Sequence, residues 1–245
     1  MHLKALITVL TAASLSAAIT VDEILDKVEA NEEPQTSKAQ VTQTVYQPDG
    51  SENVSKLITY GYNKGEKGLM EYISPARIKG MKILTLNDGD DIWFYSARTG
   101  RVRKIASHQK NQSVNNSDFS YEDLSSKDRR EDYDAKLAGE EKREGTACYK
   151  LDMKAKTPDE VYSRIVMWVD KERYVPIEAH FYDEDGRLWK KMLMHEIEKE
   201  AGYWTPKRIE MKNVMKGSRT VMQMEKTEYD IELQESMFSE RNLRR

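Results

Sequence analysis

Most of the chain alternates apolar and polar residues with the period of two that is typical of β-strands. Runs rich in Val, Ile, Thr, Tyr and Trp are each closed by a cluster of Gly, Asp, Asn or Pro. Short connections such as 47–50 and 183–186 have the residues of tight hairpin turns, so consecutive strands should be antiparallel neighbours in a long meander. The pattern predicts strands at 38–47, 53–63, 67–73, 80–87, 91–97, 101–106, 131–142, 146–156, 161–170, 174–183, 187–198, 204–215 and 219–233.

Several of these strands are apolar on both faces. Between residues 91 and 96, Ile92 and Phe94 alternate with Trp93 and Tyr95. Such strands are typical of a central sheet, or of a curved sheet with a cavity on its inner side. An ordinary barrel core and a concave face that is partly open to a hydrophobic ligand both explain the pattern. The chain has 12 Met and only 4 Phe, which slightly favours the explanation with a ligand, because flexible thioethers suit adaptable apolar surfaces.

Helical periodicity is confined to the region before Pro34. Thr20 and Glu23 fit a capping box, in which each side chain bonds the other residue's backbone N–H. The pattern predicts one amphipathic helix, which can plug or flank a half-closed barrel, with its apolar face at Val21, Ile24, Leu25 and Val28.

The polar stretch 107–128 interrupts the regular spacing of strands. Its length is typical of lids, binding loops or disordered segments. Phe119 and Tyr121 lie inside it, which suits a lid that docks and releases. A plainly mobile loop explains the stretch equally well.

The N-terminus has the layout of a secretory signal peptide: Lys4, an apolar run at 5–10 and small residues up to Ala18. The apolar run is too short to anchor the chain in a bilayer. We therefore expect cleavage after residue 18 and an exported, soluble protein without a lipid anchor, folded as one domain at 19–245. Cys148 is the only cysteine, so the domain has no internal disulfide, and we expect its thiol to be buried.

Catalytic motifs are missing from the sequence. It contains no Gly-x-Ser-x-Gly, no His-Glu-x-x-His and no phosphate-binding glycine loop. Asp183-x-Asp185-Gly186 is similar to the start of a calcium loop, but a hairpin turn explains it better. We predict no enzyme, no metal site and no cofactor, with a hydrolase using His180 and His195 as the alternative. A net charge of −3 without a basic stripe also argues against nucleic-acid binding.

Six motifs follow one another along the chain: SPARIKGMKILTL (74–86), DDIWFYSARTGRVRKI (90–105), SDFSYEDL (117–124), YSRIVMWVDKERYVPIEAHFYDEDGRLWKKM (162–192), TPKRIEMKNVMKGSRTVM (205–222) and MFSERNL (237–243). Their order resembles the outer-membrane lipoprotein-sorting protein family, that is, the LolA-like periplasmic proteins. The resemblance implies a mainly β fold: a strongly curved antiparallel sheet forming an unclosed barrel, with helices over an apolar concave mouth. In sorting carriers this cavity shelters the acyl chains of a lipoprotein, whereas relatives act as sensors or as partners of lipid-exporting pumps.

From this resemblance we predict a periplasmic carrier or chaperone that shelters acyl chains of lipids or lipoproteins, with an inner-membrane transporter as a further partner. The alternative is a regulatory or interaction domain without cargo transfer. Phe119 and Tyr121 are the predicted lid residues. Because a shift of one residue exchanges the faces of a strand, the opposite alternates could line the cavity instead. The predicted cavity wall consists of Met70, Tyr72, Leu84, Leu86, Trp93, Tyr95, Trp168 and Phe181.

Overall fold

The computed structural model describes residues 19–32 and 34–244, so the predicted signal peptide lies outside the described residues. The chain begins with helix α1 (Val21–Glu32). The predicted capping box is confirmed: the Thr20 N–H donates to the Glu23 carboxylate at 2.8 Å, and the Glu23 N–H donates to the Thr20 hydroxyl at 3.2 Å. No helix among the described residues is both long and apolar enough to cross a bilayer.

The predicted strands are all present, with ends shifted by a few residues, and they form one 13-stranded sheet. A short helix, α2 (Arg129–Asp132), precedes β7. The strands are β1 (Thr36–Tyr46), β2 (Glu52–Tyr62), β3 (Lys67–Ser74), β4 (Lys82–Leu86), β5 (Asp91–Ser96), β6 (Arg101–Ile105), β7 (Tyr133–Arg143), β8 (Thr146–Ala155), β9 (Arg164–Asp170), β10 (Pro176–Tyr182), β11 (Leu188–Glu200), β12 (Tyr203–Asn213) and β13 (Ser218–Tyr229).

The sheet is antiparallel throughout, but the predicted single meander is wrong at one point. The spatial order is β6-β5-β4-β3-β2-β1-β13-β12-β11-β10-β9-β8-β7. The first and last strands therefore pair with each other, with Thr42 opposite Gln223. As a result β6 and β7, which are consecutive in sequence, lie at opposite edges of the sheet. The chain between them has to pass from one edge to the other.

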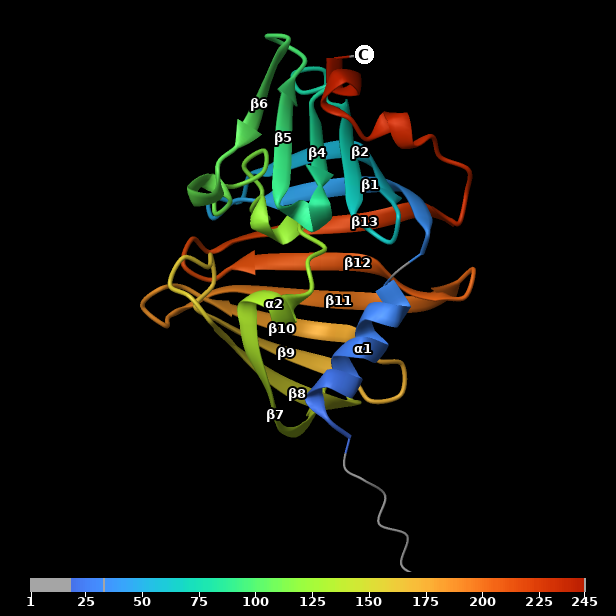
Figure 1. Ribbon diagram of the computed structural model, residues 1–245. Coiled ribbons are helices and arrows are strands. Elements are labelled where there is room, and N and C mark those ends of the chain that lie inside the picture. The colour runs from blue at the N-terminus through green and yellow to red at the C-terminus, as the bar shows by residue number, and fades with distance from the viewer. Residues whose placement is uncertain (1–18, 33, 245) are drawn as a thin grey trace, which may run out of the picture.

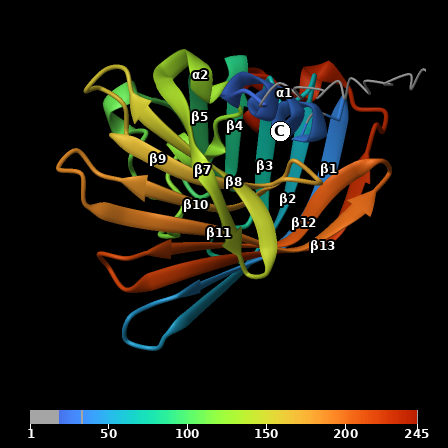
Figure 2. The ribbon, with the colours of Figure 1, turned by 90° about the horizontal axis from the view of Figure 1, so that it is seen from below.

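This connection, residues 106–132, is called the crossing segment below. The sheet curves strongly (Figure 2), and the crossing segment and α1 both lie on its concave side. In Figure 1 the segment runs from β6 at the top, in front of β12 and β11, to α2 and β7 below. The fold class predicted from the sequence is confirmed: an unclosed barrel with an N-terminal helix and a loop over its concave face.

Helix α1 covers the part of the concave face near β8 and β9. Its apolar side chains Ile24, Leu25 and Val28 are buried against a group that includes Leu151 and Val169. The helix is also tied to the crossing segment, because the Arg130 guanidinium pairs with the carboxylates of Asp26 and Glu29. The two covers of the concave face are therefore joined to each other.

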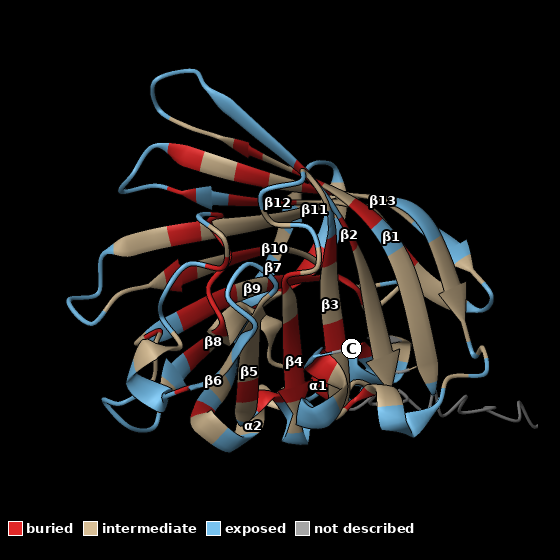
Figure 3. Cartoon of the chain, turned by 90° about the horizontal axis from the view of Figure 1, so that it is seen from above, coloured by how far each residue is buried: buried red, intermediate tan, exposed pale blue. Residues whose placement is uncertain are grey.

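The C-terminal residues 231–244 cover the opposite, convex face. Phe238 and Leu243 are buried against Leu69 and Leu84, and the last turn of the segment contacts β4 and β5. The segment is drawn in red in Figure 1. Strand interiors are buried while most hairpin turns are exposed (Figure 3). Both faces of the β3–β5 region are therefore covered by chain, which explains why both alternates of these strands are apolar.

Candidate functional site on the concave face

Methionine is the most frequent residue type in the largest apolar cluster on the concave face. Thioether side chains are unbranched and flexible, so they adapt to different apolar partners. The cluster extends across the sheet from β3, through the paired strands β1 and β13, to β8. Strands of both halves of the barrel therefore contribute to it. Its methionines are Met81, Met153, Met211 and Met222, which are buried, and Met70, Met167, Met192 and Met224, which pack against them.

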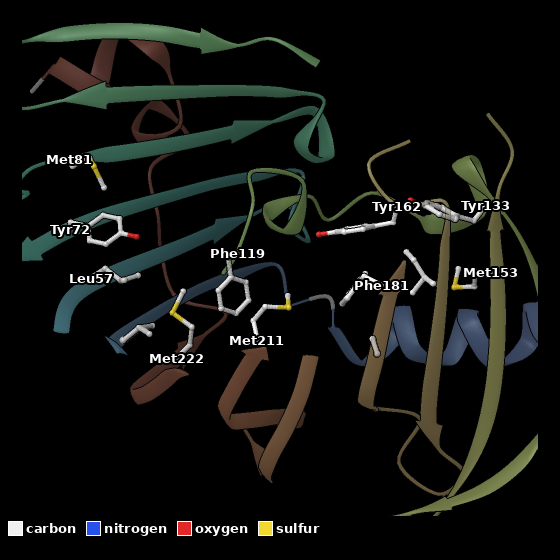
Figure 4. Packing of buried hydrophobic residues seen from close by; sticks show 13 residues of the cluster. Leu57, Tyr72, Met81, Phe119, Tyr133, Met153, Tyr162, Phe181, Met211 and Met222 are labelled. Atoms are coloured by element: carbon white, nitrogen blue, oxygen red, sulfur yellow. The ribbon is translucent and has the colours of Figure 1, made fainter. Parts of the chain in front are cut away.

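A small hairpin within the crossing segment fills this cluster; we call residues 112–124 the plug. Its backbone hydrogen bonds are largely internal: the Val114 N–H donates to the Phe119 carbonyl at 2.8 Å, and the Tyr121 N–H donates to the Gln112 carbonyl at 3.1 Å. The Phe119 ring is 8% exposed and points toward Met211 (Figure 4). The plug therefore meets the sheet through side chains, without joining its ladder of strands.

Asp118 anchors the plug to β13. This residue is 5% exposed, and its carboxylate accepts hydrogen bonds from the hydroxyls of Ser218 and Thr220. The Asp118 N–H donates to the Thr220 hydroxyl oxygen at 2.8 Å. Two uncharged hydroxyls of the sheet thus satisfy one buried carboxylate of the plug.

Asp123 forms a second anchor, on β11. Lys190 is 3% exposed, and its ammonium donates to the Asp123 carboxylate at 2.9 Å and to the Tyr162 hydroxyl at 3.0 Å. The Tyr162 hydroxyl in turn donates to the other Asp123 oxygen at 2.6 Å. The N–H and hydroxyl of Ser120, which belong to the plug itself, complete the shell at 2.7 Å each.

The pKa of the Asp123 carboxyl is set by opposing effects. Burial alone would raise it, but the charge of Lys190 and the hydrogen bonds from Ser120 and Tyr162 together lower it below its usual range. Burial, followed by the nearby carboxylate, raises the pKa of the Tyr162 hydroxyl well above its usual value. At neutral pH the site therefore holds an ionised carboxylate beside a neutral phenol.

Acid should weaken this anchor. A carboxyl whose pKa is depressed on folding contributes stability that is complete above its unfolded value, about 3.9, and is lost as pH falls toward the folded pKa. We expect the contribution of Asp123 to the free energy of unfolding to be constant between pH 5 and 8 and to decline below about pH 4. Urea titrations of the wild type and of Asp123→Asn across this range would test it. Parallel curves for the two proteins at all pH values would contradict the assignment.

Solved structures of other proteins share this fold. An outer membrane lipoprotein-sorting protein domain from Vibrio parahaemolyticus matches with a TM-score of 0.85 and 25% identity, over 91% of this chain and 97% of that one. A family model with the description "-like: Uncharacterized protein" matches residues 64–245. The chain belongs to the family of this model, and its fold is LolA-like.

Two further solved structures share this fold. A DUF1329 family protein from Desulfovibrio piger matches at 28% identity with a TM-score of 0.83, over 90% of this chain and 96% of that one. A LolA superfamily protein from Nitrosomonas europaea shares the fold at 21% identity and a TM-score of 0.76, over 91% and 99% of the two chains. No curated protein matches the sequence.

In this LolA-like chain, the residues predicted to line a cavity lie on both faces of the sheet. Met70, Tyr72 and Phe181 belong to the methionine cluster, together with the predicted lid residue Phe119. The second lid residue, Tyr121, is buried in a neighbouring group on β4–β6. The remaining residues are on the other face: Leu84, Leu86, Trp93 and Tyr95 under the C-terminal segment, and Trp168 beside Cys148.

Strand alternation explains this division. Phe94 packs toward the concave side while its neighbour Trp93 packs beneath the C-terminal segment. Because both alternates are apolar, their pattern cannot say which one faces inward. Binding of a ligand by any of these side chains stays a prediction.

The site residues that were not predicted are Lys190, Tyr162, Asp118 and Asp123. A signal for Lys190 was available, because it shares a strand face with Met192 and Met194 and is the charged member of that row. A lysine on an inward-facing, apolar row requires a buried partner. The identity of the partner could not be inferred, since Asp123 is far away in sequence.

The histidines do not meet. His180 shares a hydrogen bond of 2.6 Å with Glu178. The Nδ1 atom of His195 lies 3.8 Å from the Glu144 carboxylate. Cys148 is fully buried, as expected, and burial raises the pKa of its thiol. Within residues 19–32 and 34–244, no group of three or more His, Cys, Asp or Glu side chains is arranged to hold a metal ion.

A pocket of about 440 Å³ lies outside the methionine cluster, near the turns at the ends of β1, β11 and β12. Tyr46, Lys191 and Arg219 are among its lining residues. Phe119 occupies the centre of the methionine cluster instead of leaving it open. A ligand that binds to this cluster therefore has to displace the plug.

Proposed function

We propose that this chain is an exported, periplasmic binding protein that holds acyl chains of a lipid or lipoprotein on its concave face. The observation that carries the proposal is the plug: an apolar side chain, Phe119, occupies a methionine-rich concave cluster from a hairpin that is not part of the sheet. Removing the plug exposes an apolar surface without breaking a β-ladder. The relative from Vibrio parahaemolyticus, an outer membrane lipoprotein-sorting protein domain, points in the same direction.

The energetics suit reversible transfer. Burial of apolar surface contributes about 25 cal/mol per Å², so a few hundred Å² of acyl chain supports useful binding after ordering costs. Only molecules with an open plug can bind, so the apparent affinity is the intrinsic affinity multiplied by the open fraction. A carrier built this way binds cargo firmly enough to shield it, and the plug helps to expel the cargo at the acceptor.

The proposal includes the predicted signal peptide, a binding role in place of catalysis, and delivery to or from an inner-membrane transporter. Its first test is lipid extraction and native mass spectrometry of protein purified from the periplasm, followed by titration with a fluorescent fatty-acid probe. We expect co-purified lipid, or saturable probe binding with one site per chain. Protein that carries no lipid and binds no probe would overturn the carrier function.

Pull-down from detergent-solubilised membranes addresses the partner. Capture of a transporter together with transfer of a labelled lipid between vesicles would support the carrier. Capture of a membrane protein without any transfer would favour the regulatory domain that the sequence left open.

A further inference from the structure

The sheet presents two donors to Asp123 that do not belong to the plug. The Lys190 ammonium, on β11, and the Tyr162 hydroxyl, just before β9, are 3.0 Å apart and contact different oxygens of the same carboxylate. Tyr162 is fully buried and held by ring contacts with Phe181 and Trp189, at centroid distances of 4.7 and 5.7 Å. The pair is therefore fixed in place by the sheet and stays there when the plug leaves.

An open plug would leave Lys190 as a buried cation without a counter-charge. Such a state is strongly unfavourable, since removing one partner of a buried ion pair exposes the full desolvation cost of the other. Water that enters the open site can hydrate the ammonium, whereas a carboxylate or phosphate supplies both hydrogen-bond acceptors and the opposite charge in the two-donor geometry that Asp123 now uses.

We propose that Asp123 stands in for the anionic group of an amphiphilic ligand, and that Lys190 and Tyr162 bind that group when the plug opens. The proposal rests on the proposed function, because it assigns the polar end of the same ligand. In the closed protein Phe119 occupies the position of the apolar chain and Asp123 that of the anion. The plug thus resembles the cargo that it excludes.

The Asp118 anchor provides an internal contrast. Its partners, Ser218 and Thr220, are neutral hydroxyls that water or a hydroxyl-bearing ligand can satisfy after the plug leaves. Of these two anchors on the sheet, the one at Lys190 selects for charge. The predicted ligand class is therefore a single-chain amphiphile with a carboxylate or phosphate head group and an acyl chain on the methionine cluster.

The test compares four probes of equal chain length, by isothermal titration calorimetry below their critical micelle concentrations: dodecanoate, dodecyl phosphate, neutral dodecyl maltoside and cationic dodecyltrimethylammonium. For the wild type we expect at least one of the two anionic probes to bind about tenfold or more tightly than the neutral one, and the cationic probe to bind most weakly. The ranking of dodecanoate against dodecyl phosphate distinguishes a fatty acid from a phospholipid-like head group.

Variants separate the roles of the groups. Asp123→Asn removes the charge that competes with the ligand and should increase the affinity for the anionic probes by about tenfold. The double variant Lys190→Met with Asp123→Asn leaves no unpaired charge, so it should fold, bind the neutral probe and lose the preference for anions. Lys191→Met is the matched control, because Lys191 is adjacent in sequence and points to the other face of β11; it should behave as the wild type.

Equal affinities for the anionic and neutral probes, or a preference for anions that survives in the double variant, would overturn this proposal and leave the carrier function intact. An affinity for anionic probes that is unchanged in Asp123→Asn would also overturn it, since the carboxylate would then not compete with the ligand. Absence of binding of all four probes to every variant would reject the proposal together with the carrier function.

Discussion

Replacement of Lys190 by methionine should lower the free energy of unfolding by about 3–5 kcal/mol. The side chain is 3% exposed, and methionine has a similar length, so little packing is lost. The loss arises from Asp123, whose carboxylate remains buried against the sheet without a counter-charge. Urea denaturation followed by circular dichroism at pH 7.5 measures the change.

Second substitutions show whether the charge is responsible. Adding Asp123→Asn to Lys190→Met should recover most of the lost stability, because replacing both partners of a buried ion pair by uncharged groups is often close to neutral. Lys191→Met, on the other face of β11, should change the free energy of unfolding by no more than about 0.5 kcal/mol. A double variant as unstable as Lys190→Met alone would assign the effect to packing instead of charge.

The strands and the helix could be predicted from the sequence because their signals are local. Alternation of apolar residues and Gly-containing turns give each strand, and the Thr20–Glu23 pair fixes the start of α1. The pairing of β1 with β13 has no such signal, since the residues that meet, such as Thr42 and Gln223, are far apart in sequence. The position of β6 and β7 at opposite edges of the sheet follows from that pairing, so it could not be predicted either.

The face that each side chain occupies was the least predictable feature. Trp93 and Phe94 lie under different covers, the C-terminal segment and the crossing segment respectively, and both covers contribute apolar residues. A strand covered twice carries no polar face from which its orientation could be read. The family resemblance predicted a cover on the concave side, but it contained no indication that residues 231–244 shield the convex side.

The polar character of the crossing segment concealed the anchors of the plug. Asp118, Ser120 and Asp123 are typical of a solvated loop when their sequence is considered alone. Their buried partners on β11 and β13 become visible only when the sheet brings Lys190 and Thr220 beneath the segment. Buried polar residues specify where the plug docks, and Phe119 supplies the apolar contact.

Truncation of Phe119 to alanine should increase the affinity for acyl chains. Large-to-small substitutions of buried aromatic residues cost about 3–5 kcal/mol, and here the loss falls on the closed state, because the open state does not contain this contact. As long as the open form is the minor one, a closed state weaker by about 3 kcal/mol raises the open fraction, and with it the apparent affinity, by up to about 100-fold. Titration of the variant with the fluorescent fatty-acid probe measures the change.

Phe238→Ala is the matched control for this prediction. Phe238 is 4% exposed against 8% for Phe119, but it packs on the convex face under the C-terminal segment. Both substitutions remove an aromatic ring from an apolar contact, so both should lower the free energy of unfolding. Only Phe119→Ala should change the affinity for the probe, because only that ring competes with the ligand for the methionine cluster. Equal affinities of the two variants would mean that the plug is permanent core and that the ligand binds elsewhere on the molecule.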